Sequence, residues 1–135
     1  MISVSFLILG CLIFILLGGI HWRSAIYTNK FEPEDSSMLE QMKSNYSKIT
    51  NQSSIWTSVT GFHLSHSLGL IVFGVLYIAL AIDNPSYLFS SIVLQGLLLV
   101  VPIIYTLLAQ KYWFSLPRNG FIIGFCLIVL SLILS

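Results

Sequence analysis

The stretch "WTSVTGFHLSHSLGLIVFGVLYIALAI" (residues 56–82) contains no Asp, Glu, Lys or Arg. A helix needs about 20 predominantly apolar residues to cross the ~30 Å hydrocarbon core of a bilayer. This stretch exceeds that length, and it is flanked by polar segments on both sides. It therefore predicts a membrane-spanning helix.

The composition of the whole chain agrees with a membrane protein. The chain has 135 residues, of which 56% are hydrophobic and 8% are charged. Soluble domains carry roughly 25% charged residues, so this chain lacks the groups that cover a water-facing surface. A net charge of +1 without any cluster of Lys and Arg also excludes nucleic acid as a partner. The expected partner is the lipid bilayer.

Uncharged runs recur along the chain and predict four spans in a single integral membrane domain. The spans are expected at about residues 2–22, 56–82, 87–110 and 117–135, with a polar loop at 23–55. Short connections join the last three spans, so neighbouring helices are antiparallel. The predicted fold is all-α: a four-helix transmembrane bundle with up-down topology.

The polar loop contains one helical pattern, in "EPEDSSMLEQMKSNY" (residues 32–46). Pro33, Glu34 and Asp35 are typical of a helix start. Apolar residues then recur every three to four positions: Met38, Leu39, Met42, Tyr46 and Ile49. The pattern predicts a short amphipathic helix between spans one and two, on the membrane surface or over the bundle. A mobile polar loop is the alternative.

The charges predict the orientation of the spans. All six Lys and Arg residues fall on the same side of the four-span arrangement. Under the positive-inside rule this side is cytoplasmic, so loop 23–55 faces the cytoplasm and both termini face outward.

Three histidines are predicted to lie in the cytoplasmic half of the membrane. Counting 1.5 Å per residue from an interfacial Trp56 puts His63 about 10 Å deep and His66 about 15 Å deep, near the middle of the bilayer. His21 ends the first span and enters from the same side. Ionisable residues within a membrane are functional-site hypotheses by default.

The first interpretation of these polar residues is helix packing. His66 and Gln95 are expected at the same depth and would form a hydrogen bond across two helices. Ser65 or Ser67 would bond to carbonyl groups of their own helix. Small residues would permit close helix approach at Gly61, Gly69, Gly74, Gly120 and Gly124.

The second interpretation is a binding site. His66, His63, Ser67, Gln95 and Tyr105 would then orient a mostly apolar ligand, in a non-catalytic subunit or binding protein. A membrane enzyme or carrier for a lipid-like molecule is the alternative, with His66 as acid/base. The spans contain no carboxylate to assist such chemistry, and no catalytic residue is assigned.

The third interpretation is a metal or haem site formed by His21, His63 and His66, because neutral imidazole is the commonest metal ligand. Two histidines three residues apart on one helix cannot occupy opposite faces of one haem. A bis-histidine haem would therefore pair His21 with His63 or His66. No second metal-binding motif supports this interpretation, and no cofactor is assigned.

Three stretches together resemble a group of small uncharacterised four-span bacterial membrane proteins: "HW" at 21–22, "IWTSVTGFHLSHSLG" at 55–69 and "KYWFSLP" at 111–117. The group shares a Trp, a Gly-Phe-x-x-Ser-His-Ser-Leu-Gly stretch and a Tyr-Trp-Phe-x-x-Pro stretch. The resemblance emphasises Trp56, Gly61, Phe62, Ser65, His66, Ser67 and Gly69, with Tyr112, Trp113, Phe114 and Pro117.

The resemblance has three implications. His63 departs from the group, in which a polar amide is expected at that position, so His66 becomes the stronger site candidate. The resemblance also implies a bacterial inner membrane, but no activity. A chain with so little polar surface is further expected to join a larger membrane complex or a homo-oligomer.

Overall fold

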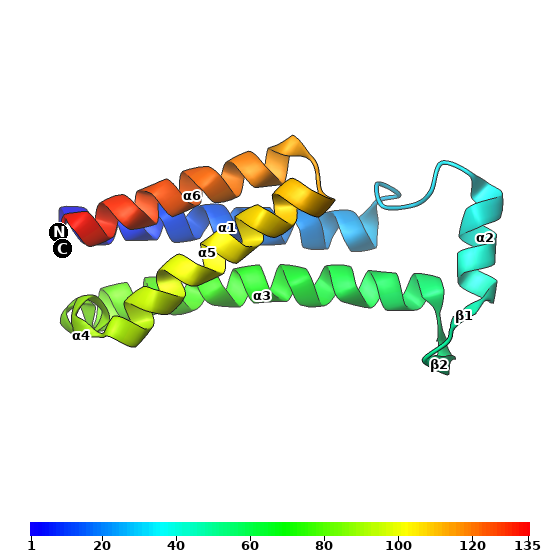
Figure 1. Ribbon diagram of the computed structural model, residues 1–135, viewed down its shortest axis with the longest axis horizontal. Helices are drawn as coiled ribbons and strands as arrows, with labels where there is room; N and C mark the ends of the chain where they lie inside the picture. Colours follow the sequence, from blue (N-terminus) through cyan, green and yellow to red (C-terminus); the bar gives the residue numbers. More distant parts are fainter. The chain divides into compact units, whose positions relative to one another are not determined.

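The computed structural model describes all residues from 1 to 135, and it is predominantly helical (Figure 1). Four helices are long and apolar enough to cross a membrane: α1 (Ile2–Tyr27), α3 (Ile55–Asp83), α5 (Ile92–Tyr112) and α6 (Ser115–Ile133). The predicted all-α fold with four spans is confirmed. The chain is a small integral membrane protein.

The chain divides into two compact units. The bundle unit comprises Met1–Leu17 and Leu70–Ser135, and the loop unit comprises Gly18–Gly69. Helices α1 and α3 contribute one end to each unit. The single membrane domain remains a prediction.

The core of the bundle unit is apolar and centred on Phe14, whose side chain is fully buried. Its ring lies 5.3 Å from the ring of Phe73 on α3 and 5.4 Å from that of Phe121 on α6, measured between centroids. Phe14 therefore joins α1 to two other helices. Other buried apolar residues are Leu7, Cys11, Leu70, Tyr77, Ala81, Leu88, Leu98, Ala109 and Ile128.

Glycines allow α1 to approach its neighbours closely. A Cβ at Gly74 of α3 would lie 2.8 Å from the carbonyl oxygen of Cys11, and one at Gly10 would lie 2.9 Å from that of Gly124. Close approach at small residues is how membrane helices gain packing contacts. The prediction is confirmed for Gly74 and Gly124, but it is wrong for Gly61, around which nothing lies within 4 Å of an added Cβ.

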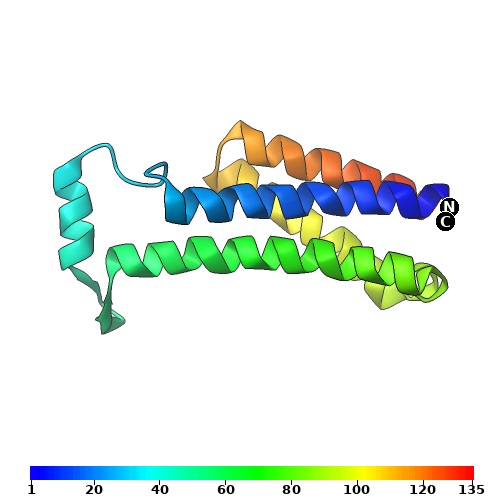
Figure 2. The same cartoon turned by 180° about the vertical axis from the view of Figure 1, so that it is seen from behind.

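The two ends of the chain are held together in the bundle unit. Ser131 of α6 is fully buried, and its hydroxyl donates a 2.7 Å hydrogen bond to the carbonyl oxygen of Ser3 on α1. The N and C termini lie side by side in both views (Figures 1 and 2). An even number of spans puts both ends of the chain on the same side of the membrane, and the Ser131–Ser3 hydrogen bond holds the end of α6 against the start of α1.

The third span differs from its predicted bounds of 87–110. A short helix, α4 (Pro85–Ser90), comes first, and α5 begins only at Ile92. The Asn84 side chain caps α4, and the hydroxyl of Ser91 accepts a 3.4 Å hydrogen bond from Leu94 and caps α5. The Ser91 cap satisfies an N–H group in the first turn of α5, so that a new helix can start at Ile92.

The other bounds need smaller corrections. Helix α1 continues to Tyr27 instead of ending at residue 22, which shortens the polar connection. Helix α6 begins at Ser115, two residues before the predicted start, so that Pro117 lies in its first turn. Proline is tolerated there because the first N–H groups of a helix have no partner within the helix.

The loop unit contains the predicted short helix, α2 (Ser36–Ser44), followed by a hairpin of β1 (Tyr46–Ser47) and β2 (Thr50–Ser54). Met38, Leu39 and Met42 lie on α2 as expected. Tyr46 and Ile49 do not, because α2 ends at Ser44 and is capped by Asn45, whose side chain donates to the carbonyl oxygen of Gln41. The hairpin was not predicted, and Ile49 at its turn is exposed.

The start of α2 should depend on pH. The side chain of Asp35 accepts a 2.8 Å hydrogen bond from the backbone of Ser37, and hydrogen bonds to Ser37 lower the pKa of this carboxyl group. Because the pKa is lower in the folded protein, the ionised carboxylate stabilises the helix at pH values above the pKa of the unfolded chain. This stabilisation is lost as the pH falls through the pKa of the folded protein. We expect the Cα chemical shifts of Ser36–Ser44 to move toward coil values below about pH 4. Asp35→Asn should keep the cap without this pH dependence; an identical transition in that variant would show that Asp35 is not its source.

Candidate functional site

Three histidines meet in the loop unit. His21 comes from the end of α1, whereas His63 and His66 come from the start of α3. The Nε2 atom of His21 lies 3.0 Å from the Nδ1 atom of His63, within hydrogen-bond distance. The ring centroid of His21 is 5.0 Å from that of His63 and 5.2 Å from that of His66.

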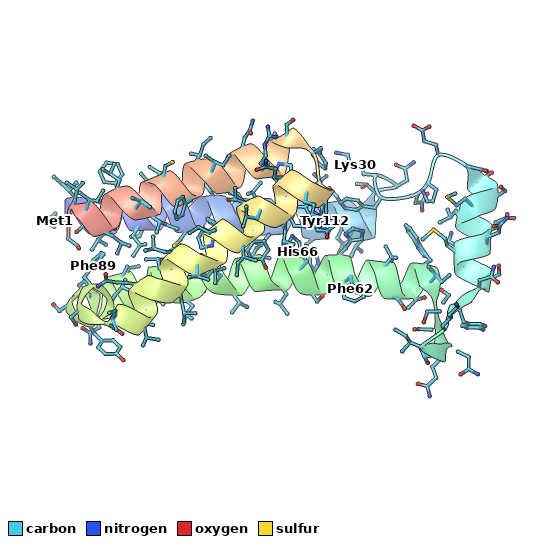
Figure 3. All side chains as sticks on the ribbon, viewed as in Figure 1. Met1, Lys30, Phe62, His66, Phe89 and Tyr112 are labelled. Carbon is cyan, nitrogen blue, oxygen red and sulfur yellow. The ribbon has the colours of Figure 1, made fainter.

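A fourth ring, Phe31, belongs to this site. Phe31 stacks on His63 with a centroid distance of 4.3 Å and an interplanar angle of 18°. It also lies 4.7 Å from the ring of His21. His21, Phe31, His63 and His66 are called the histidine cluster below; Figure 3 labels His66 on α3.

Phe31 was not among the predicted site residues, although the sequence contains a signal for it. Phe31 is an aromatic residue between two charged ones, Lys30 and Glu32, and it is partly buried while both neighbours are exposed. The backbone turns here, since the N–H of Glu32 donates to the carbonyl oxygen of Asn29. An apolar ring inside a charged turn indicates burial against a nearby site.

The His21–His63 hydrogen bond constrains both imidazoles. A neutral imidazole has one N–H donor and one acceptor nitrogen, so the two rings must adopt complementary tautomers. The other ring nitrogen of His63, Nε2, makes no hydrogen bond to the protein, and no buried polar side-chain atom lacks a partner. His63 Nε2 is therefore accessible, and its donor or acceptor character depends on the tautomer of His21.

The hydroxyl groups near the cluster are engaged with their own helix. Ser67 donates to the carbonyl oxygen of His63 at 2.9 Å, and Ser65 donates to that of Phe62 at 3.1 Å. This bonding to carbonyl groups was predicted and is confirmed. Neither hydroxyl is hydrogen-bonded to an imidazole nitrogen, the arrangement that would activate it as a nucleophile.

The remaining predicted site residues, Gln95 and Tyr105, belong to the bundle unit. The amide of Gln95 donates a 2.6 Å hydrogen bond to the carbonyl oxygen of Phe89, across the break between α4 and α5. The ring of Tyr105 lies 5.4 Å from that of Phe121. Both residues thus have a packing role in their own unit, and their participation in a site with His66 remains a prediction.

The geometry does not favour the metal and haem interpretation. No group of three or more His, Cys, Asp or Glu side chains is arranged to hold a metal ion. In a bis-histidine haem the two nitrogens lie on opposite sides of the iron, and metal–nitrogen bonds of ~2.0 Å would separate them by about 4 Å. The facing nitrogens of His21 and His63 are 3.0 Å apart and share a hydrogen bond instead. Binding by His21, His63 and His66 would require these rings to turn.

Comparison with known proteins identifies no family. No protein-family model matches the chain, and neither a curated protein nor a solved structure matches it. The resemblance to small four-span bacterial proteins therefore remains a prediction. The function has to be inferred from the histidine cluster itself.

Proposed function

We propose that this small integral membrane protein binds an amphipathic, lipid-like molecule at the histidine cluster and does not convert it. The observation that carries this proposal is the 3.0 Å hydrogen bond between His21 and His63. It fixes the His63 ring and leaves Nε2 as an accessible polar atom among aromatic rings. A few oriented polar atoms in mostly apolar surroundings are typical of small-molecule sites.

The helix lengths support a position near the edge of the hydrocarbon core. Helix α3 has 29 residues and is about 43 Å long at 1.5 Å per residue, which exceeds the ~30 Å core. Counted from the charged residue Asp83 at its other end, His63 lies about 30 Å along the axis. Counted from Ile2 at the start of α1, His21 lies about 29 Å along that axis.

Both counts bring the cluster to the level at which hydrocarbon gives way to headgroups. This level is shallower than the one obtained by counting from Trp56. A polar headgroup would meet the imidazoles there, while its apolar tail would remain in the membrane. The cluster contains no carboxylate or ammonium group, so an uncharged headgroup with hydrogen-bonding atoms suits it best.

Binding is favoured over catalysis because the cluster lacks an activated nucleophile. The hydroxyls of Ser65 and Ser67 are bonded to helix carbonyls. The alternative function is acid/base chemistry on a lipid-like molecule. The histidine pair alone would serve it, because His21 is hydrogen-bonded to His63 and would orient that ring as a general base. Turnover of the bound molecule by the purified protein would favour this alternative.

We further propose the cellular setting. A bacterial inner membrane, with loop 23–55 in the cytoplasm and both termini outside, agrees with the one-sided Lys and Arg residues. The many apolar side chains exposed on the spans would face lipid, a larger membrane complex or a second copy of the chain.

The test is mass spectrometry of small molecules that copurify with the protein in detergent. His63→Leu should reduce the amount of the bound molecule about tenfold, because its hydrogen bond and its stacking ring are lost together. Phe62→Leu is the matched control, since Phe62 is exposed on the same helix and should change nothing.

His66→Ala separates binding from packing. A lower melting temperature with unchanged ligand content would assign His66 to packing alone. Equal ligand content in the wild-type protein and in the His63 and His66 variants would contradict the proposed site.

A further inference from the structure

Phe31 lies on the face of His63 that a bound planar ring would use. The two rings are nearly parallel, at 18°, with their centroids 4.3 Å apart. Most ring pairs in this protein are tilted: His21 makes angles of 50° with His63 and 47° with Phe31. A flat stack of this kind is the contact that an imidazole makes with a planar aromatic ligand.

The stacking platform is fixed, but its cover is not held by secondary structure. His63 lies within α3 and is oriented by its hydrogen bond to His21. Phe31 lies in the connection between α1 and α2, where no helix or strand is present. Its immediate neighbours, Lys30 and Glu32, are exposed. A movement of this connection would uncover His63 without unwinding a helix.

We propose that Phe31 is a displaceable plug, and that the molecule bound at the cluster carries a planar conjugated ring which replaces Phe31 on His63. The ring would stack on the face of His63 in place of Phe31, and an apolar tail would remain in the membrane, as in membrane quinones and similar lipids. This inference rests on the proposed binding function and names the ligand class of the same site.

The plug reduces the apparent affinity for a ring that competes with it. Binding is possible only in the fraction of molecules in which Phe31 has left His63, so the apparent dissociation constant rises as that fraction falls. A side chain that covers His63 without a ring would be displaced more easily. Replacing Phe31 by Leu should therefore strengthen binding of a planar ring.

The experiment is an equilibrium titration of the full-length protein in detergent with tetramethyl-1,4-benzoquinone. This quinone has no free ring position, so the exposed thiol of Cys126 cannot add to the ring and form a stable ring adduct. The ring-saturated dione of the same substitution is the matched ligand control, because it keeps both carbonyl groups but cannot stack flat. The melting temperature of each variant is measured to verify that it is folded.

Phe31→Leu is expected to bind the quinone about three- to tenfold more tightly than the wild-type protein. Phe31→Trp should bind it more weakly, His63→Leu should not bind it, and the dione should bind to none of them. Weaker quinone binding by Phe31→Leu, equal binding of quinone and dione, or no quinone binding by any folded variant would overturn the proposal.

These outcomes are separate from those for the proposed function. One outcome is that a copurifying molecule is lost in His63→Leu, but the quinone titration does not give the expected differences. This outcome would support the binding site and refute only the plug and the planar ring. Loss of both results would refute the site as well.

Discussion

Gly74→Ala is expected to destabilise the bundle unit by about 1–3 kcal/mol. The added Cβ would lie 2.8 Å from the carbonyl oxygen of Cys11, and this backbone atom can move only if α1 and α3 separate. The separation would also weaken the contacts of the Phe14 ring with α3. A reversible denaturant titration in mixed micelles would measure the change.

The same substitution at Gly96 should have the opposite sign. Nothing lies within 4 Å of a Cβ added there, and Gly96 is inside α5. Alanine is preferred over glycine in a helix, so Gly96→Ala should stabilise the protein by about 0.5–1 kcal/mol. If both variants changed stability equally, close approach at Gly74 would not be the reason for its effect.

Phe14→Ala is expected to cost about 2–4 kcal/mol, which is less than the ~3–5 kcal/mol typical of a buried Phe in a soluble protein. Phe14 is fully buried and contacts the rings of Phe73 and Phe121, so its truncation leaves a cavity between three helices. The expected loss of stability is smaller than in a soluble protein for a physical reason. Lipid tails are apolar, so a membrane helix gains little from transferring a side chain out of lipid, while the lost packing contacts count in full.

Two further variants separate packing from hydrophobicity. Phe14→Leu should recover roughly half of the loss, because it refills part of the cavity. Phe62→Ala removes a side chain that is 76% exposed and should change the free energy of unfolding by less than about 0.5 kcal/mol. A loss at Phe62 as large as that at Phe14 would contradict the packing explanation.

The number of spans was predictable because each span requires a long uncharged run, and the chain has four. The meeting of His21 with His63 and His66 was predictable for a related reason. Consecutive spans are antiparallel, so the end of the first and the start of the second lie on the same side of the membrane. These predictions depend only on membrane thickness and chain direction.

The details that failed depend on contacts between particular atoms. Uncharged composition does not show that Ser91 caps a new helix, because serine fits both a helix interior in lipid and a cap. The amide of Gln95 donates to the carbonyl oxygen of Phe89 across this break, a contact that was not predicted, and the pairing of Gln95 with His66 stays a prediction. Phe31 was missed because side chains in a polar loop follow no periodic pattern that would assign them to a face.

The bond between Ser131 and Ser3 determines when the bundle can be completed. These residues are 128 positions apart, and α1 packs against α6 through Gly10 and Gly124 as well. During synthesis the first helix therefore enters the membrane with one face unpaired, and that face stays in contact with lipid until the last helix arrives. Assembly of this bundle therefore waits for α6, and a ribosome that stalls before α6 leaves an incomplete α1 surface for quality-control proteases to recognise.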